Sequence, residues 1–390
     1  MKQTMITRQR IVSFGIPAAA AATIGLAAIL TPLLTAKSPV TKTAVTKDVK
    51  STATPHGKHA VDVVFAVDTT GSMGGLLDGA KRTVWSIAQH IQKTDPDADV
   101  RIGLVAYRDV GDEYVTKDLP LTRDLDAVFA ELSTFEAAGG NDIPEDVDAA
   151  MDVALHKMQW RADAKKLMFV VGDAPPASRG EVPTFDVLAR EAGTKQIVIN
   201  AIRAGQDRDT AASFAQIAAL SGGQFSTIQQ DGGVHQIATP YDDKMAALQN
   251  EIDGTAIIVG DEGARTGYTR RMEAAAAAPA AAKADRATYY AHKGASGAPA
   301  DDLVGGIASG EMTWDGVAQG SLPADLRGKS KDELAKEVAV RTEKRAKAQA
   351  ELETVTKQRE EFLDGEKKKS ADPADAFDSS VNAAIDAQLK

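Results

Sequence analysis

Cysteine is absent from this chain of 390 residues. The absence excludes a disulfide framework, thiolate zinc sites, iron–sulfur clusters and a cysteine nucleophile. It does not identify a compartment, because a chain without thiols tolerates any redox environment. The obvious metal ligands that remain are hydroxyl and carboxylate oxygens.

Aromatic residues and basic charge are also scarce. Phe, Trp and Tyr make up 5% of the residues, and 45 Lys and Arg stand against 55 Asp and Glu, for a formal net charge of −10. A protein that binds nucleic acid non-specifically needs a basic face to displace phosphate counterions. We therefore expect no nucleic-acid partner. Apolar residues, at 43%, are still numerous enough for a sizeable core.

One long uncharged stretch, residues 11–36, follows three basic residues, Lys2, Arg8 and Arg10. Its length is about that of a membrane-spanning helix. Residues 1–36 are therefore predicted to be a retained membrane anchor or a cleaved signal peptide, with a buried soluble helix as a third interpretation. Leu34 is large for a position just before a signal-peptide cut. We expect export to the periplasm or the extracellular space, or anchoring to the cytoplasmic membrane with the bulk of the chain outside.

The texture of the sequence changes at residue 61, after a Thr-, Lys-, Ser- and Pro-rich segment (37–60) that predicts a flexible linker. Short apolar runs then alternate with segments of helical periodicity. The expected strands are 61–67, 100–107, 167–171, 197–202 and 224–229, with 113–122 as an exposed edge strand. The expected helices are about 76–93, 124–136, 144–160, 184–192, 209–220 and 241–252. This alternation predicts an α/β fold, a doubly wound and mostly parallel sheet over residues 61–260.

Polar residues follow the ends of the predicted strands, where an open parallel sheet binds its ligands. The first strand is followed by Asp68, Thr70 and Ser72, and the third apolar run by Asp173. Oxygen ligands that include hydroxyls suit a hard divalent cation, Mg²⁺, Mn²⁺ or Ca²⁺. The structural alternative is that Asp68 only caps the following helix. At the same edge, Arg108 and Asp109 are interpreted as a strand-end ion pair rather than as ligands.

The segments that carry these residues resemble the von Willebrand factor type A family, in the branch found in extracellular and bacterial proteins. Residues 64–73, VFAVDTTGSM, are similar to the first loop of its metal-ion-dependent adhesion site, Asp-x-Ser/Thr-x-Ser after the first strand. Residues 139–146, GGNDIPED, and 169–176, FVVGDAPP, resemble the second and third loops. The resemblance covers about residues 58–255, with the loops in the expected order.

The resemblance implies a metal site and a way of using it. Thr70 and Ser72 would ligate the metal directly through their hydroxyls, while Asp68 and Asp173 would hold it directly or through water. Neutral hydroxyls leave the cation incompletely neutralised. An Asp or Glu carboxylate of a protein partner can then complete its coordination, which is the family's adhesive mechanism.

The second loop departs from the family's usual threonine. The candidate ligand there is Asp142, with Asn141 as the neighbour that a shift of one residue would select. A carboxylate at this position strengthens cation binding and weakens the attraction of an incoming acid. The departure therefore bears more on partner affinity than on metal binding.

Enzyme motifs are incomplete around the same residues. A haloacid-dehalogenase-type phosphatase needs a second Asp where Thr70 stands, and a serine hydrolase needs a glycine at that position, before Ser72. A P-loop needs Gly-x-x-x-x-Gly-Lys-Ser/Thr, whereas residues 74–81 contain the additional Ala80. We expect a binding protein and no enzyme; a metal-dependent hydrolase is the weakest alternative.

The C-terminal third predicts an α-helical region. Residues 261–328 are rich in Ala and Gly and predict short helices, and residues 329–369 predict a long charged helix that opens with a capping box. Three arginines occupy positions of its heptad seam, Arg341, Arg345 and Arg359. The seam predicts either a coiled-coil homo-oligomer through residues 330–364 or a helix that lies on the rest of the chain. In the first case the chain would be an assembly scaffold with a structural metal site. The tail, 370–390, is expected to be mobile.

Overall fold

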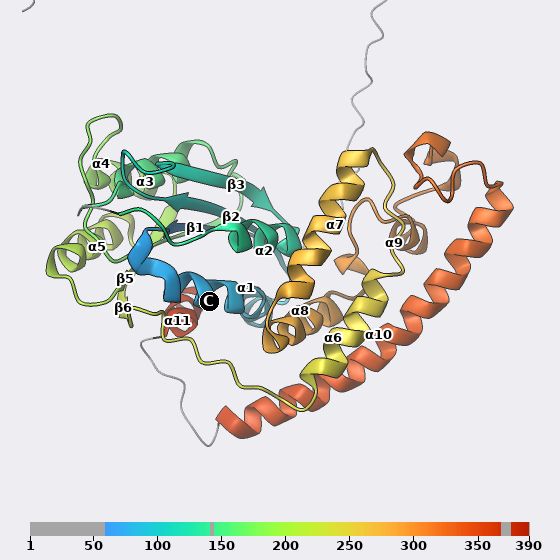
Figure 1. Cartoon of the computed structure of the whole chain (residues 1–390). Coiled ribbons are helices and arrows are strands. Elements are labelled where there is room, and N and C mark those ends of the chain that lie inside the picture. Colours follow the sequence, from blue (N-terminus) through green and yellow to red (C-terminus); the bar gives the residue numbers. More distant parts are fainter. Residues whose placement is uncertain (1–58, 141–143, 368–375, 390) are drawn as a thin grey trace, which may run out of the picture. The chain divides into compact units, whose positions relative to one another are not determined.

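The computed structural model describes residues 59–140, 144–367 and 376–389, which belong to a single compact unit (Figure 1). The predictions for residues 1–36, and for the linker as far as residue 58, lie outside these ranges. None of the helices within the described ranges combines the length and the apolar character needed to cross a membrane.

Six strands form one sheet in the order β3-β2-β1-β4-β5-β6. They are β1 (His59–Asp68), β2 (Ala98–Tyr107), β3 (Thr116–Thr122), β4 (Lys165–Gly172), β5 (Ile197–Ala204) and β6 (Phe225–Ile228). Only β3, the predicted edge strand, runs antiparallel to its neighbour. The strand order reverses direction between β1 and β4, so the gap above their carboxyl ends is the switch point where ligands bind in such sheets. The predicted doubly wound sheet is thereby confirmed.

Helices cover both faces of the sheet (Figure 1). One face carries α1 (Gly74–Thr94) and α2 (Leu125–Thr134); the other carries α3 (Val147–His156), α4 (Phe185–Thr194) and α5 (Arg208–Ser221). Alternate residues of β1 enter opposite cores, Val63 and Phe65 beside α1, Val64 and Ala66 beside α3. Because side chains of a strand alternate, an apolar run such as residues 61–67 indicates burial on both sides.

The prediction of a mobile tail is wrong for residues 377–389, which form helix α11 (Phe377–Leu389). Four apolar residues spaced by four positions, Phe377, Val381, Ile385 and Leu389, lie on one face of this helix and are buried in the core beside α1. The ring centroid of Phe377 lies 6.4 Å from that of Phe65 in β1. The last helix of the chain therefore covers the sheet.

The helix expected to close the sheet domain, near 241–252, is α6 (Asp242–Asp253), and it packs elsewhere. It lies against α8 (Ala280–Lys293) and α10 (Lys331–Lys367), as Figure 1 shows. The region expected to hold only short helices contains α7 (Glu262–Ala277) and α8, with 16 and 14 residues, besides the short α9 (Leu303–Ser309). The packing thus does not follow the boundary expected at residue 260.

The heptad seam of α10 is filled within the chain. Its apolar positions are buried: Leu334, Val338, Ala348, Leu352 and Val355. Arg345 pairs with Asp302 at 2.6 Å, and Arg359 pairs with Asp242 at 2.9 Å. The structure therefore agrees with the interpretation of a helix lying on the rest of the chain, and the assembly hypothesis loses the face on which it was based.

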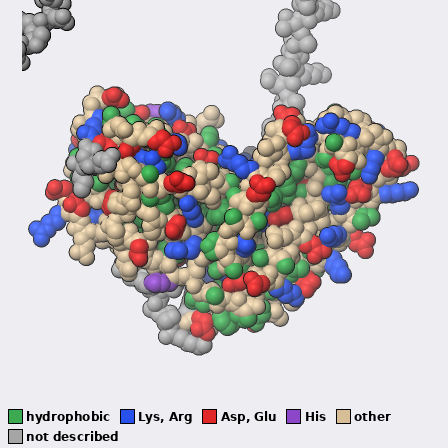
Figure 2. All heavy atoms as spheres, in the orientation of Figure 1, with side chains coloured by type: hydrophobic (Ala, Val, Ile, Leu, Met, Phe, Trp, Pro, Cys, Tyr) green, Lys and Arg blue, Asp and Glu red, His purple; other side chains and the backbone are tan. Residues whose placement is uncertain are grey.

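Charges of both signs are interspersed on the surface in Figure 2.

An ion-pair network joins the amino ends of β1 and β2. Asp62 is fully buried and accepts hydrogen bonds from Arg101 and Arg161 at 2.7 Å. Asp99 accepts from Arg123 and Arg161, each at 2.5 Å. Burial alone raises the pKa of Asp99, but the hydrogen bonds and charges of the two arginines outweigh it and lower the pKa to about 2.

This network predicts a loss of stability in acid. An unfolded Asp has a pKa of about 3.9, so the depressed pKa of Asp99 stabilises the fold above that pH, and this contribution disappears as the pH falls toward about 2. We expect it to be on the order of 1–2 kcal/mol, because Arg123 is half-exposed and screened by solvent. Thermal unfolding between about pH 2 and 7 should show a flatter acid limb for Asp99→Asn than for the wild type. Exposed Asp163→Asn is the control, and superimposable curves for wild type and Asp99→Asn would contradict the assignment.

Candidate metal centre

Asp68 is the last residue of β1 and is fully buried at the carboxyl edge of the sheet. Its Oδ1 accepts hydrogen bonds from the backbone N–H of Thr70 at 2.8 Å and from the Thr70 hydroxyl at 2.7 Å. Its Oδ2 is buried and has no hydrogen-bond partner within the described structure. Asp68 does not cap α1, because the N-cap residue of that helix is Met73 and no side-chain capping hydrogen bond forms there. The turn therefore uses one carboxylate oxygen and leaves the other for a ligand.

Thr70 and Ser72 lie on the turn that leads from β1 into α1. The Thr70 side chain is buried, whereas Ser72, within the single 3₁₀ turn Gly71–Met73, is exposed. A Cβ on Gly140 would lie 2.8 Å from the Thr70 Cβ, so the second loop closes directly over Thr70. Gly140 has a φ of +71°, a conformation that glycine adopts readily. The two hydroxyls therefore differ in access to solvent.

Asp173 follows β4 directly and is fixed by a residue that sequence reasoning did not single out. The side-chain amide of Gln230 donates to Asp173 Oδ2 at 2.7 Å and to the Ser72 carbonyl at 3.4 Å. Gln230 follows β6, so the rule that ligands gather after strand ends pointed to its position. The structure thus brings four of the predicted ligands to one edge, on both sides of the switch point: Asp68, Thr70, Ser72 and Asp173.

The fifth predicted ligand, Asp142, and its alternative, Asn141, lie outside the described residues. The loop that precedes them is anchored beside the first loop, because the Gly71 N–H donates to the Gly139 carbonyl at 3.3 Å. The Gly140 N–H donates to the carboxylate of Asp112 at 3.2 Å. The second-loop ligand stays a prediction.

Glu145 is a carboxylate at this edge that the sequence prediction missed. Its side chain is 3% exposed, and its Oε2 is buried without a hydrogen-bond partner in the described structure. It belongs to the segment GGNDIPED, but acidic residues just before a helix are most simply explained as caps. The neighbouring Asp146 is the cap of α3, accepting from the Ala149 N–H at 2.9 Å. Glu145 is left without that role.

Two carboxylates at this edge, Asp68 and Glu145, have raised pKa values, mainly because they are buried. Burial is the main cause of a pKa of about 7 for Asp68. The hydrogen bonds from Thr70 and the backbone N–H of Asp173 oppose it, whereas repulsion from the Asp173 carboxylate adds to it. Burial likewise raises the pKa of Glu145 to about 8, with further repulsion from Asp68. The Tyr107 hydroxyl, which donates to the Val171 carbonyl at 3.1 Å, has a raised pKa through burial and the same carboxylates. A bound cation would offset this concentration of negative charge.

The expected ion pair at this edge forms with a different partner. Asp109 pairs with Arg179 of the third loop, whose Nε lies 2.9 Å from Asp109 Oδ1. Arg108 instead donates to the backbone carbonyls of Thr69, at 3.1 Å, and Glu136, at 2.7 Å. Both residues therefore hold loops around the site, and the Asp109 oxygens are occupied by Arg179.

The donor set fits a hard cation that is held in part by hydroxyls. Within the described ranges no group of three or more His, Cys, Asp or Glu side chains has the arrangement of a metal site. A site here therefore depends on the hydroxyls of Thr70 and Ser72 in addition to carboxylates. The buried, unpartnered Oδ2 of Asp68 is the atom of the set that most clearly needs a ligand.

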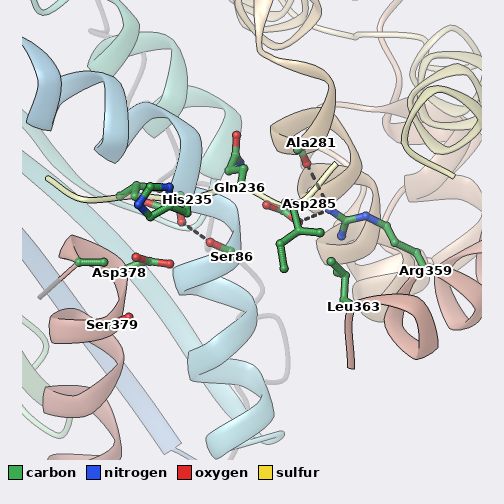
Figure 3. A pocket seen from close by; sticks show the side chains of 13 residues that line it. Ser86, His235, Gln236, Ala281, Asp285, Arg359, Leu363, Asp378 and Ser379 are labelled. Atoms are coloured by element: carbon green, nitrogen blue, oxygen red, sulfur yellow. Dashed lines mark hydrogen bonds and ion pairs between the residues drawn. The ribbon is translucent and has the colours of Figure 1, made fainter. Parts of the chain in front are cut away.

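A cavity of about 120 Å³ lies away from this edge, among α1, α8, α10 and α11 (Figure 3). Its most prominent charged group, Arg359, faces Asp285 at 2.8 Å in addition to its pair with Asp242. The positive charge of Arg359 is thus neutralised by the chain's own carboxylates, and we assign no ligand to this cavity.

Comparisons with known proteins give one family match, which lies in the sheet domain, and similarities over part of the chain. The profile of the family described as "von Willebrand factor A domain" matches residues 62–230. The alpha-protein kinase vwkA of Dictyostelium discoideum is 28% identical over 116 residues, which are 30% of this chain and 18% of that protein. A putative ariadne-like RING finger protein, R811, of Acanthamoeba polyphaga mimivirus is 28% identical over 134 residues, 34% of this chain and 13% of that protein. The chain thus spans less than a fifth of the length of either relative.

Solved structures with similarity to part of this chain include two of named source. Protein BatB from Bacteroides thetaiotaomicron is 14% identical, with 43% of this chain and 90% of that chain covered and a TM-score of 0.33. Proximal thread matrix protein 1 of the mussel byssus, with a zinc-occupied metal-ion-dependent adhesion site, is 17% identical, with 44% of this chain and 42% of that chain covered and a TM-score of 0.36.

Proposed function

We propose that this chain, whose residues 62–230 are a von Willebrand factor type A domain, binds a divalent cation and, through it, an acidic group of a protein partner. Such domains often mediate protein interactions through a metal-ion-dependent adhesion site and are generally interaction modules rather than enzymes. The observation that carries the proposal is the buried, unpartnered Oδ2 of Asp68 beside the hydroxyl of Thr70. Mg²⁺ is the cation we favour, with Mn²⁺ and Ca²⁺ as alternatives.

The predicted ligands would have different roles, depending on how exposed each side chain is to solvent. Asp68 is fixed by Thr70 and can turn its free oxygen to the cation or to a water that the cation holds. Asp173 is held in place by Gln230, and Ser72 is exposed. The outer side of the site therefore faces solvent, where an Asp or Glu carboxylate of a partner can reach a cation that hydroxyls have only partly neutralised.

Two apolar side chains border the same edge of the sheet. Val110, in the loop after β2, is 50% exposed, and Val187, in the first turn of α4, is 49% exposed. Both belong to loops or helix starts at the carboxyl ends of strands. They would give a protein partner apolar contacts around the charged centre, which a small acid would not use.

We also propose that the domain works outside the cytoplasm, exported or tethered through residues 1–36. The support is the uncharged stretch of residues 11–36 after three basic residues. Fractionation of cells together with N-terminal sequencing checks it. A mature N-terminus near Lys37 indicates cleavage, an intact terminus in the membrane fraction indicates tethering, and an intact soluble chain in the cytoplasm contradicts both.

Loss of cation binding in Asp68→Ala is the expected result that tests the site. The substitution removes the orphan carboxylate oxygen and the acceptor that orients Thr70. We expect the affinity for Mg²⁺, Mn²⁺ or Ca²⁺ to fall by about 100-fold or more, measured by titration calorimetry of the full chain. Asp78→Ala, on the exposed side of α1, is the matched control. Equal heats for wild type and Asp68→Ala, or none for either, would remove the proposal.

A further inference from the structure

We propose that Glu145 is a carboxylate of the cation site, an internal acid that contributes to holding the cation from the side of the second loop. The inference rests on the proposed function, because it concerns the same cation. It adds a residue that neither the resemblance nor the sequence pattern assigned to the site. Its basis is the burial, the position and the missing partner of this one side chain.

The first argument is energetic. A buried carboxylate without hydrogen bonds is costly, and folded proteins almost always pair such a group or neutralise it. Glu145 is 3% exposed, its Oε2 has no partner, and within the described ranges no Lys or Arg forms an ion pair with it. The charged groups that act on it most are themselves acidic: Asp68, Asp109, Asp112 and Asp173. A cation is the missing component that would make this arrangement favourable.

The second argument is the placement of the side chain. The point that a Cβ on Gly140 would occupy lies 3.0 Å from Glu145 Oε1 and 2.8 Å from the Thr70 Cβ. The carboxylate and the predicted ligand Thr70 therefore flank the same glycine. Because Gly140 has no side chain, nothing from that residue separates them.

The backbone of Glu145 ties the second loop to the third. Its N–H donates to the Pro175 carbonyl at 3.1 Å, and its carbonyl accepts from the Ala177 N–H at 2.7 Å. Pro175 follows Asp173 by two positions, so this short bridge fixes the distance between the two carboxylate-bearing loops. The side chain is thus positioned by the scaffold and not by a mobile loop tip.

The consequence for function concerns the partner. Glu145 would add a carboxylate to a donor set that otherwise depends on the hydroxyls of Thr70 and Ser72 together with Asp68 and Asp173. An additional carboxylate beside the cation offsets more of its charge, so the attraction for a partner's carboxylate is weaker than hydroxyl ligands alone would give. Glu145 accordingly favours the retention of the cation over the capture of an acid.

The experiment is Glu145→Gln in the full chain, with Glu181→Gln as the matched control. Both substitutions replace a carboxyl group by an amide near the same edge, but the Glu181 side chain is exposed. We expect Glu145→Gln to lower the Mn²⁺ affinity measured by calorimetry by about 10- to 100-fold. In chelator it should not lower the thermal midpoint, because the buried Oε2 of Glu145 makes no hydrogen bond that the substitution could remove. Glu181→Gln should change neither quantity appreciably.

The outcomes separate this inference from the proposed function. If wild type binds Mn²⁺, Asp68→Ala does not and Glu145→Gln binds as the wild type does, the site stands and the role of Glu145 is overturned. A midpoint in chelator that falls for Glu145→Gln, with unchanged Mn²⁺ affinity, overturns it too, since that result indicates a structural role. If no variant and no wild type binds Mn²⁺, the proposed function fails first.

Discussion

Removal of the last helix is expected to abolish cooperative folding of the sheet domain. A chain that ends after residue 375 lacks α11 and exposes the core beside α1 and β1. Burial of each large apolar side chain on α11 contributes about 1.5–3 kcal/mol, and four of them are lost together. The free energy of unfolding of a whole domain is only about 5–15 kcal/mol, so the deletion removes a large part of it. Circular dichroism and urea unfolding measure the loss.

Polar contacts show that α11 is seated specifically. The Phe377 N–H donates to the Gly232 carbonyl at 2.8 Å, and the Gln388 side chain exchanges hydrogen bonds with Asn200 of β5 at 2.7 and 3.0 Å. Lys165 of β4 donates to the carbonyls of Gln388 and Leu389 at 3.2 and 3.1 Å. Contacts at both ends of the helix therefore fix its register on the sheet.

Single substitutions in α11 distinguish the loss of its apolar packing from the effect of a shorter chain. Phe377→Ala should lower the free energy of unfolding by about 3–5 kcal/mol, whereas Ala387→Gln, on the exposed face of α11, should change it by less than about 0.5 kcal/mol. A synthetic peptide of residues 376–390, added to the shortened chain, should restore part of the lost structure. A shortened chain that unfolds at the same urea concentration as the wild type would contradict the assignment.

The sheet was predictable from the sequence because its signals are local. Strands 61–67 and 167–171 read as continuous apolar runs, and polar residues at their ends mark the switch point. Asp68 and Thr70 could be placed for the same reason, since the turn that joins them spans two positions. The arginines in the seam of α10 were open to two interpretations, because the sequence does not show where Asp242 and Asp302 lie.

What escaped prediction depends on contacts between distant segments. Residues 377–389 carry an apolar face at four-residue spacing, but nothing local says that this face takes a place beside α1 while α6 packs on α8 and α10. Gln230 contacts Asp173 although the two residues are 57 positions apart in the sequence. Glu145 comes from the end of the second loop. The fold brings these two side chains to the site, so local motifs did not identify them.

Arg286 is the second place where one substitution should have a large effect. This arginine of α8 is 4% exposed and donates to both oxygens of Asp126 in α2, at 2.8 and 2.6 Å. Its Nη1 donates to Asp253, at the end of α6, at 2.7 Å. Although burial alone lowers the pKa of Arg286, the two carboxylates outweigh it and raise the pKa well above its usual range. One cation thus joins the helix on the sheet to two of the C-terminal helices.

Truncation of this arginine leaves Asp126 buried with no counter-charge, which is more costly than losing the attraction alone. We expect Arg286→Met to lower the free energy of unfolding, measured by urea denaturation, by about 3–5 kcal/mol. The double variant Asp126→Leu with Arg286→Met should recover most of that loss, because apolar side chains of similar volume avoid the desolvation of both charges. Arg270→Met, whose pair with Glu131 is at the surface, is the control and should cost less than about 1 kcal/mol. If Arg286→Met is no less stable than Arg270→Met, the buried pair does not hold the helices to the sheet. If the single and double variants are equally unstable, the charge of the arginine is not what stabilises the fold. Its packing and its contact with the Tyr290 ring, 5.0 Å away, then account for the effect.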